Sequence, residues 1–478
     1  RCRSKAKNET EIVTPITIHG AGPLANLTYE LYRQLPIATD VKKKSLPGEG
    51  RKLLTFYDSR QGAARFAAFL QDVSNKQNYR QIIPQAIELC LQTDEWGDNA
   101  SPNLFVLSNK CGEIAWKKGI IQNDPDSTFW RCSSSSFSAE QRKFAAKWMA
   151  RIILGEFTTG RRSRQSLESM GLVGVSYFRK DDQPDFTRLG KIIGLSSDQS
   201  SALVGHLLDD LRYRKAVKLP SDIYPDDPEF GTNKGNPHFI RQGKPHSGEE
   251  RWIGDTPRQL RRRYIQHILE INQIDSSYRN VEKTLTSIWD WLIDIEGLFI
   301  GSSIEGYQLN PAHLYFDTHQ SWYRCTKCQR LSYRGTLMPC PYPNCGGDLE
   351  PIDIAITQSQ NYYYNLFHQP LIPIRVEEHT AQLDSEKGKD YQDYFKAGYI
   401  NALSCSTTFE MGIDLGDLQA VAMSNVPPTV ANYRQRAGRA GRRTSGTAFI
   451  LTWASDRPHD QVYYDTPNEI ISGQVTVP

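Results

Sequence analysis

The residues best suited to chemistry lie near the C-terminal end of the chain, in the run Gln435-Arg436-Ala437-Gly438-Arg439-Ala440-Gly441-Arg442. Arginine suits phosphate recognition because its planar guanidinium stays charged and binds phosphate through two hydrogen bonds. The two glycines let the backbone approach a bound group closely. The run therefore indicates a site whose arginines, which follow Gln435 at short intervals, bind a polyphosphate. The alternative is a solvated basic helix face.

Four cysteines form a second group, with the spacing of metal ligands. Cys325 and Cys328 make a Cys-x2-Cys pair, and Cys340 and Cys345 make a Cys-x4-Cys pair. Each pair can offer two thiolates, and four thiolates complete the tetrahedron that Zn²⁺ prefers. Since no ligand position is left open, we expect a structural zinc whose binding supplies folding energy to a small ribbon. Free cysteines or disulfides are the alternative.

The elements that must position the arginines follow the order of a parallel α/β sheet. Residues 401–415 read as a short strand that runs into a turn, and residues 420–424 form a second strand before the arginine-bearing helix. Residues 51–57 predict a further strand, and apolar positions at helical spacing predict a helix over residues 62–70. In such sheets the site lies at the strand ends.

The turn before that helix is a candidate for phosphate contact. Asp58 and Ser59 are suitable N-cap residues, and the exposed amides of a helix N-terminus can hold a DNA phosphate. A plain helix cap is the alternative for Ser59 and Arg60.

Taken together, these segments resemble a known family. The run Ser406-Thr407-Thr408-Phe409-Glu410-Met411-Gly412-Ile413-Asp414, followed by residues 435–442, resembles motifs V and VI of superfamily 2 (DEAD/DEAH-type) helicases. The strand and turn over residues 51–61 resemble motif IV. All three motifs belong to the second RecA-like domain of these enzymes. Residues 378–383 are more narrowly similar to the large bacterial helicases of the Druantia and DISARM phage-defence systems and to related repair helicases.

The resemblance implies roles for residues on the nucleotide side. Arg439 and Arg442 would reach the γ-phosphate of ATP, and Gln435 would lie beside that phosphate or the attacking water. Gly412 would allow close approach, and Asp414 would bond the ribose or couple the nucleotide to the DNA. The other arginines of this region, at 434, 436 and 443, are interpreted as surface or DNA-side charges.

A set of nucleic-acid contacts is implied in the same way. Its members are Ser59, Arg60, His379, Thr380, Thr407 and Thr408. Hydroxyl and backbone contacts of this kind position a strand without reading its sequence. His379 has no nucleophile near it in the sequence, so we interpret it as a backbone contact and not as a catalytic base.

The order of segments predicts a RecA-like domain divided by an insertion of about 250 residues, far longer than a loop. The expected divisions are a connector from a missing N-terminal domain (1–50), the start of the second RecA-like domain (51–72), a helical, winged-helix-like insertion (73–320), a four-cysteine zinc ribbon (321–351) and the remainder of the RecA-like domain (352–478). We expect the sheet to resume with a strand at residues 353–357 and another at 371–376. A basic cluster over residues 142–164 predicts a DNA-backbone surface, with an inert winged-helix spacer as the alternative.

Composition limits the possibilities further. The chain has 478 residues, a net charge of +3 and nine cysteines. We find no run of about 18 apolar residues and no signal peptide, so we expect a cytoplasmic protein without a membrane partner. No Gly-x-x-x-x-Gly-Lys-Ser/Thr loop is present in the printed sequence. This fragment, without Walker A and B motifs, should therefore be inactive alone, with ATP and Mg²⁺ held mostly by a missing first RecA-like domain.

The sequence thus predicts an α/β fold, a RecA-like parallel sheet interrupted by the helical insertion and the zinc ribbon. The predicted function is that of an ATP-dependent DNA helicase or translocase acting on single strands or duplex junctions, possible partners being subunits of an anti-phage defence system. An RNA helicase, an inactive DNA-binding scaffold and a role in DNA repair are the alternatives.

Overall fold

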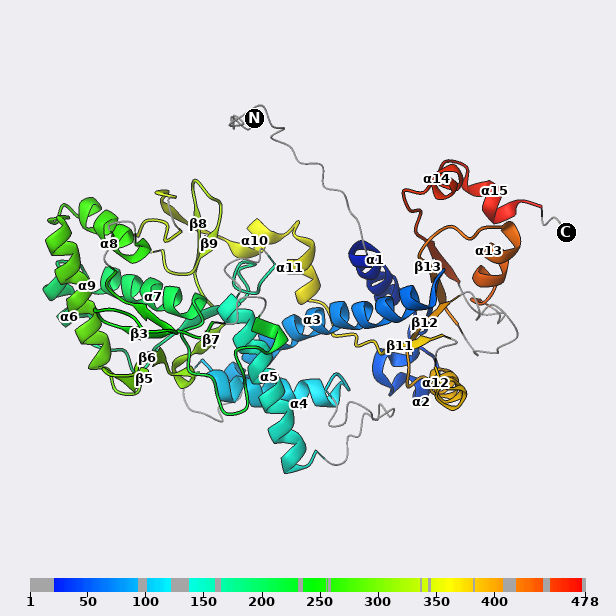
Figure 1. The fold of residues 1–478 in the computed structure, drawn as a ribbon, viewed down its shortest axis with the longest axis horizontal. Helices are drawn as coiled ribbons and strands as arrows, with labels where there is room; N and C mark the ends of the chain where they lie inside the picture. Colours follow the sequence, from blue (N-terminus) through cyan, green and yellow to red (C-terminus); the bar gives the residue numbers. More distant parts are fainter. Residues whose placement is uncertain are drawn as a thin grey trace. The chain divides into compact units, whose positions relative to one another are not determined.

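The computed structural model describes residues 21–92, 101–121, 137–159, 165–230, 235–254, 256, 259–335, 338–342, 345–380, 383–406, 418–441 and 448–474. The chain separates into two compact units (Figure 1). Unit 1 comprises residues 1–78, 126–132 and 372–478, and unit 2 comprises residues 79–125 and 133–371. Both units therefore contain segments from distant parts of the sequence.

Unit 1 is built around a five-stranded sheet in which every pair of neighbours is parallel. Its strands are β1 (Leu53–Tyr57), β11 (Val376–His379), β12 (Ala402–Ser406), β13 (Ala420–Met423) and β14 (Phe449–Thr452). Its helices are α1 (Ala21–Gln34), α2 (Val41–Lys44), the first part of α3 (Arg60–Gln92), α12 (Ser385–Ala397), α13 (Val430–Ala437), α14 (Pro458–Asp465) and α15 (Pro467–Ser472). The strand order is β11-β12-β1-β13-β14, so β1 is central.

Helices cover both faces of this sheet, and alternate residues of β1 show why. Leu53 packs with Phe66 of α3 and Tyr32 of α1, whereas the next residue, Leu54, packs with Phe395 of α12. Because successive side chains of a strand point to opposite faces, a strand buried on both sides is apolar at consecutive positions. The predicted α/β fold with a parallel sheet is confirmed.

Helix α1 belongs to unit 1, although the sequence predicted a connector over residues 1–50. Tyr29 and Tyr32 of α1 are fully buried against the sheet. The Tyr32 hydroxyl donates to the Pro373 carbonyl at 3.0 Å, and the Arg51 side chain donates to the Leu35 carbonyl at 2.8 Å. An amphipathic helix buries its apolar stripe, so within the described residues this range is part of the domain core.

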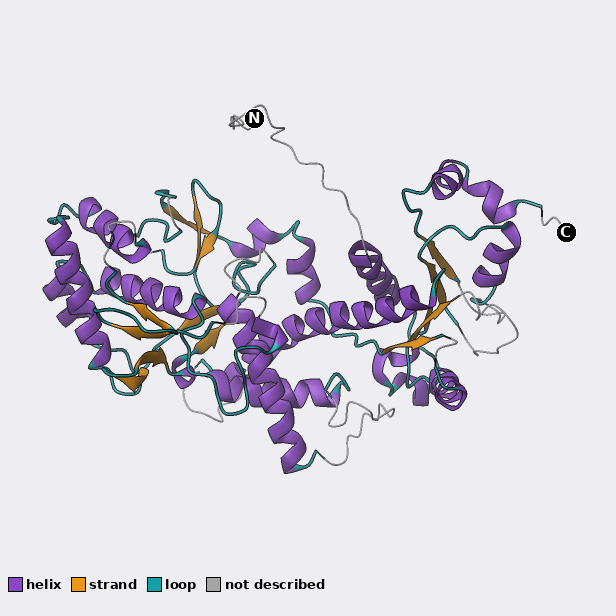
Figure 2. Ribbon diagram, viewed as in Figure 1, coloured by secondary structure: helices purple, strands orange, loops and turns teal. Residues whose placement is uncertain are grey.

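Unit 2 is mostly helical, with three small sheets (Figure 2). Its helices are the rest of α3, α4 (Leu104–Lys117), α5 (Ala139–Thr159), α6 (Phe186–Ile193), α7 (Ser197–Tyr213), α8 (Leu260–Ile271), α9 (Tyr278–Ile293), α10 (Ile354–Gln358) and α11 (Tyr362–Phe367). Its strands are β2 (Gly174–Ser176), β3 (His238–Ile240), β4 (Glu249–Arg251), β5 (Phe299–Ser302), β6 (Gly306–Leu309), β7 (Tyr315–Asp317), β8 (Trp322–Cys325), β9 (Leu331–Ser332) and β10 (Leu349–Ile352).

Part of unit 2 has winged-helix connectivity. In chain order its helices and strands run α7, β3, β4, α8, α9 and then the hairpin β5–β6, and β4 pairs parallel with β3 at the edge of the sheet. β3 pairs antiparallel with β6 through Phe239 and Tyr307, and β6 pairs antiparallel with β5. A first strand paired with the second strand of a later hairpin resembles the strand pairing of a winged helix, to which β4 adds a fourth strand; the winged-helix-like insertion stays a prediction.

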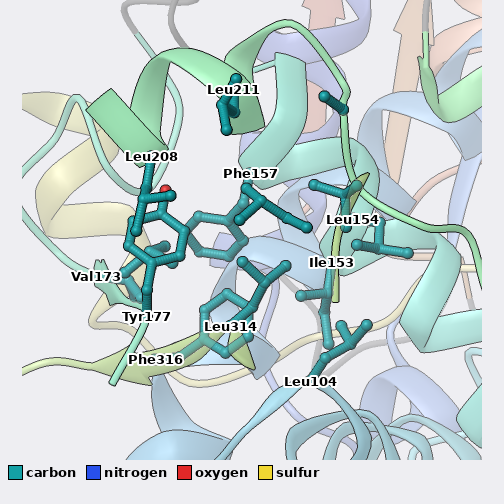
Figure 3. Close-up of a cluster of buried hydrophobic side chains, with 14 of the residues drawn as sticks. Leu104, Ile153, Leu154, Phe157, Val173, Tyr177, Leu208, Leu211, Leu314 and Phe316 are labelled. Atoms are coloured by element: carbon teal, nitrogen blue, oxygen red, sulfur yellow. The ribbon is translucent and has the colours of Figure 1, made fainter. Parts of the chain in front are cut away.

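The core of unit 2 is a continuous cluster of buried aliphatic and aromatic side chains (Figure 3). Phe157 of α5 and Phe316 of β7 have ring centroids 4.9 Å apart within it. Helices α4 and α5 approach closely beside this cluster, where a Cβ added to Gly112 would lie 2.9 Å from the backbone of Ala145. Only glycine permits such an approach.

Two strands that the sequence predicted are placed differently. Residues 353–357, expected as a strand, begin helix α10, because Asp353 caps it by accepting from the Ile356 amide at 3.1 Å. The strand expected at residues 371–376 lies further along, as β11. Among the described residues, no helix is both long and apolar enough to cross a bilayer.

Candidate nucleotide, nucleic-acid and metal sites

The parallel register of the sheet brings the ends of several strands in unit 1 to one edge. Tyr57 at the end of β1 is level with Ser406 of β12, and His379 of β11 is level with Cys405. Phe56 is likewise level with Met423 of β13. Segments that are more than 300 residues apart in the sequence, after β1 and after β11, therefore follow strands at the same edge, where ligands of parallel sheets bind.

Ser59 and Arg60 lie at this edge and are exposed. The Ser59 hydroxyl accepts from the Gly62 amide at 3.0 Å, so Ser59 is the N-cap of α3 as predicted. Exposed amides and a guanidinium at a helix N-terminus can hold a phosphate. Their contact with nucleic acid stays a prediction.

His379 and Thr380, the other expected nucleic-acid contacts in the described residues, are less exposed. The His379 ring lies against α12, with Nε2 3.1 Å from the Gly388 carbonyl and 3.0 Å from the Gln392 amide. Burial lowers the pKa of His379, so the ring is held neutral. Thr380 is buried.

Helix α13 carries the arginine run. Thr429 caps it by accepting from the Asn432 amide at 3.2 Å. Gln435 is exposed on this helix, whereas Arg439, just after its end, is only 7% exposed. Arg439 lies near Cys405 of β12: burial raises the pKa of that thiol, and the positive charge of Arg439 opposes the rise. Arg439 therefore lies close to the sheet at the end of α13.

Arg436 is buried beside these residues, although the sequence analysis interpreted it as a surface or DNA-side charge. It is 1% exposed, its guanidinium lies 5.5 Å from the centre of the Phe56 ring, and it is 3.8 Å from the Asp58 carboxylate. Asp58 also accepts from the Asn425 amide. The helical spacing contained the signal, since Arg436 follows Tyr433 by three positions, on the inner face.

Five of the predicted site residues lie outside the described residues. They are Thr407, Thr408, Gly412, Asp414 and Arg442. Their roles stay predictions.

The four cysteines of the predicted ribbon come together in unit 2. Their sulfur atoms all lie within 4.8 Å of one another. Cys325 and Cys345 are 3.4 Å apart at sulfur, and Cys328 and Cys340 are 3.7 Å apart. With Zn–S bonds of about 2.3 Å, the sulfurs of a tetrahedral site would be separated by about 3.8 Å, so the four thiols fit zinc.

The surroundings of these thiols shift their pKa values in opposite directions. Burial opposes ionisation of Cys325, but the backbone amides of Cys328 and Lys327 outweigh it and lower the pKa of Cys325 to about 7. Burial raises the pKa of Cys340. The strands β10, β8 and β9 form a three-stranded sheet beside the cluster, so the ribbon has the local architecture of a structural metal site.

The basic cluster that was expected to bind DNA is paired with carboxylates at two of its described members. Lys147 lies 3.3 Å from Asp222, and Arg151 lies 3.2 Å from Glu229. Arg142 is exposed and donates to the Phe137 carbonyl at 3.1 Å, and three more arginines of that cluster, 161, 162 and 164, lie outside the described residues. Helix α5 therefore offers less uncompensated positive charge than its sequence indicates.

Comparison with known proteins gives a family match across the arginine run. Residues 353–444 match the helicase conserved C-terminal domain. The Druantia protein DruE of Escherichia coli (strain UMEA 4076-1) is 32% identical over 194 residues, which are 35% of this chain and 10% of that protein. The ATP-dependent helicase HRQ1 of Saccharomyces cerevisiae is 37% identical over 119 residues, 25% of this chain and 11% of HRQ1.

Among solved structures, the DUF1998 helicase MrfA bound to DNA matches 22% of this chain and 14% of its own, with 25% identity and a TM-score of 0.20. That score is too low to indicate a shared overall fold. The chain spans about a tenth of the length of the two curated relatives named above. The resemblance to superfamily 2 helicases is confirmed for the segment that carries the arginine run.

Proposed function

We propose, from the helicase-type C-terminal domain that this chain contains, that it supplies the second RecA-like domain of an ATP-dependent DNA helicase or translocase. The observation that carries the proposal is the coincidence of the family match with the site. Residues 353–444 include β12, β13 and α13, and this segment holds Gln435, exposed on α13, and Arg439, buried near β12.

The proposed chemistry is ATP hydrolysis between two RecA-like domains. Phosphoryl transfer depends mostly on positioning and charge neutralisation, and an arginine supplied across a domain boundary can contribute several orders of magnitude in rate. In this proposal Arg439 and Arg442 neutralise charge on the γ-phosphate and Gln435 orients the attacking water. Gly412 and Asp414 contact the nucleotide. A separate RecA-like domain binds most of the ATP and Mg²⁺.

The nucleic-acid side is proposed at the edge where β1, β11 and β12 end. Ser59 and Arg60 are exposed there. Thr407 and Thr408 directly follow β12 in the sequence and offer hydroxyls to a phosphate, and His379 ends β11 with Thr380 directly after it. Contacts to phosphate hold a strand in register without selecting its sequence, as a translocating enzyme requires.

Zinc is the proposed occupant of the four cysteines. With four sulfur ligands and no open position it supplies folding energy to the ribbon and no catalysis. A cytoplasmic location, where thiols stay reduced, is part of the same proposal.

The proposed setting is anti-phage defence, and it rests on the similarity to a Druantia protein. A role in DNA repair is the alternative. We propose DNA over RNA on the winged-helix connectivity of unit 2, a fold that often binds DNA.

The test uses the full-length protein. Arg442→Ala should lower the ATPase kcat by a factor of roughly 10³ or more, the usual range for such an arginine, with little change in affinity for single-stranded DNA. Arg434→Ala is the matched control, because Arg434 is exposed on α13 and donates to the Gly473 carbonyl. Equal turnover in the Arg442→Ala protein and the unmodified protein would refute the proposed role. Parallel assays with RNA strands decide between the two nucleic acids.

A further inference from the structure

Tyr333 and Arg334, which lie between Cys328 and Cys340 in the sequence, contact the helical part of unit 2. We call the segment that contains these two residues the arm. The arm carries Tyr333 and Arg334, and Arg334 is midway between the two cysteines in the sequence. Arg334 donates from Nε to Asp209 of α7 at 3.1 Å and from Nη2 to the Val175 carbonyl. The arm therefore contacts two elements that are distant from the ribbon in the sequence.

Further contacts fix the arm in place. The Tyr333 hydroxyl donates to Glu168 at 2.7 Å, and His206 Nε2 lies 2.9 Å from the carbonyl oxygen of Arg334. Gly205 of α7 makes room for the guanidinium, because an added Cβ would lie 2.6 Å from Arg334 Nε. An alanine at position 205 would therefore displace the Arg334 guanidinium from its place against α7.

The arm completes a buried charge network. Glu168 and Asp209 are each 8% exposed, and Arg212 of α7 is completely buried between them. Arg212 and Arg334 together balance the two carboxylates. If the arm leaves, two buried carboxylates share one cation, an arrangement that is strongly unfavourable in a low-dielectric interior.

The position of the arm depends on the metal site, because both of its ends are metal-ligand candidates. A ribbon with so small a core is expected to owe its fold to metal binding. Without metal the ends of the arm are no longer fixed to each other, and ordering the arm costs more conformational entropy.

We propose that the arm carrying Tyr333 and Arg334 couples occupancy of the four-cysteine site to the order of helix α7, so that loss of metal loosens the helical body of unit 2 as well as the ribbon. This coupling goes beyond the proposed helicase activity and does not depend on it. It makes the insertion responsive to zinc supply and to oxidation of its thiols.

The experiment is hydrogen exchange, followed by mass spectrometry, on the chain loaded with ZnCl₂ and on the same chain after treatment with EDTA. Peptides over residues 203–213 should exchange roughly tenfold faster or more without zinc, the change that 1.4 kcal/mol of lost local stability gives. Peptides of β1 should not change. Unchanged protection of α7 after metal removal, or a chain that binds no zinc, would overturn the proposal.

Variants separate the arm from the metal. Arg334→Ala should increase exchange in α7 while metal analysis still finds zinc, and Gly205→Ala should do the same although alanine ordinarily favours a helix. Arg330→Ala is the matched control, because Arg330 is exposed in the same loop and its guanidinium carbon lies 4.4 Å from the centre of the Tyr342 ring. If α7 is as protected from hydrogen exchange in Arg334→Ala as in the control, the arm does not couple the metal site to α7. The exchange experiments contain no nucleotide or nucleic acid, so failure of the helicase proposal leaves their results unaffected.

Discussion

Replacing Arg212 by methionine tests the buried charge network most directly. Arg212 donates to Glu168 at 2.7 Å, to Asp209 at 3.0 Å and to the Tyr177 hydroxyl at 2.9 Å. Burial opposes ionisation of Asp209, but Arg334 and Arg212 outweigh it and hold the pKa of Asp209 well below its usual range. The Asp209 carboxylate is therefore charged in the folded protein, and Glu168 and Asp209 both pair with Arg212.

Methionine fills much of the volume of Arg212 but carries no charge. Glu168 and Asp209 would then face Arg334 as their remaining guanidinium partner in this network. Removing one partner from a buried ion pair costs about 3–5 kcal/mol, a large fraction of the roughly 5–15 kcal/mol that stabilises a domain. Protonation of one carboxyl would relieve the imbalance, so the free energy lost should be smaller at pH 5 than at pH 8.

Urea unfolding followed by tryptophan fluorescence measures this loss, because most of the described tryptophans belong to unit 2. They are Trp116, Trp148, Trp252, Trp289, Trp291 and Trp322. The double variant Arg212→Met, Glu168→Gln should lose at least about 1 kcal/mol less free energy of unfolding than the sum of the losses in the two single variants. Arg179→Met is the control, since its pair with Asp181 is exposed and screened by solvent, so its loss should change the free energy of unfolding little. If Arg212→Met costs no more than Arg179→Met, the network does not stabilise unit 2.

Three further predictions concern metal, pH and salt. Metal analysis should find about one zinc per chain and none in Cys325→Ser, and a folded protein without metal would contradict the zinc assignment. Because the pKa of Asp209 is lowered on folding, the charged carboxylate contributes fully to the free energy of unfolding above its unfolded pKa of about 3.9. This contribution is lost as the pH falls from there through the lower pKa of the folded state. As the pH is lowered below about 4, the urea concentration at the midpoint of unfolding of unit 2 should thus decrease. The decrease should be less steep in Asp209→Asn, and an equal dependence on pH in the two proteins would contradict this prediction. The affinity of the full-length protein for single-stranded DNA should fall steeply with salt, and Arg60→Ala should reduce that slope, whereas an unchanged slope would remove Arg60 from the contact set.

The sheet of unit 1 could be predicted from sequence because its signals are local. Short runs rich in apolar and small residues predict strands that the structure places at residues 53–57, 402–406 and 420–423, and the predicted fold class follows from their order. Helix α3 was predicted only in part. Its first turns pack on the sheet through Phe66 and Leu70, and its later turns pack into unit 2 through Ile82 and Ile83. A helix that passes from one core to another does not keep one apolar face, so periodicity underestimates its length.

Burial of polar side chains was harder to predict. The β-branched residues at 354–357 favour a strand, but the Asp353 cap and the packing of Ile354 against Gly171 give a helix. Arg436 and Arg212 are both fully buried, and each is paired with carboxylates from distant segments. Such pairs depend on long-range contacts, which one sequence without its fold does not reveal.

The insertion leaves the parallel sheet intact because the residues of unit 1 that precede it are hydrogen-bonded to those that follow it. Asn401 is fully buried, donates to the Arg51 carbonyl at 3.3 Å and accepts from the Arg375 amide at 3.0 Å. Gln71 of α3 similarly accepts from the Val376 amide at 2.9 Å and donates to the Ile374 carbonyl at 3.1 Å. These contacts link residues before the insertion to residues after it. Doubling the length of a connection adds only about 0.6 kcal/mol of closure entropy, so a large, separately packed unit is tolerated between α3 and the edge strand β11.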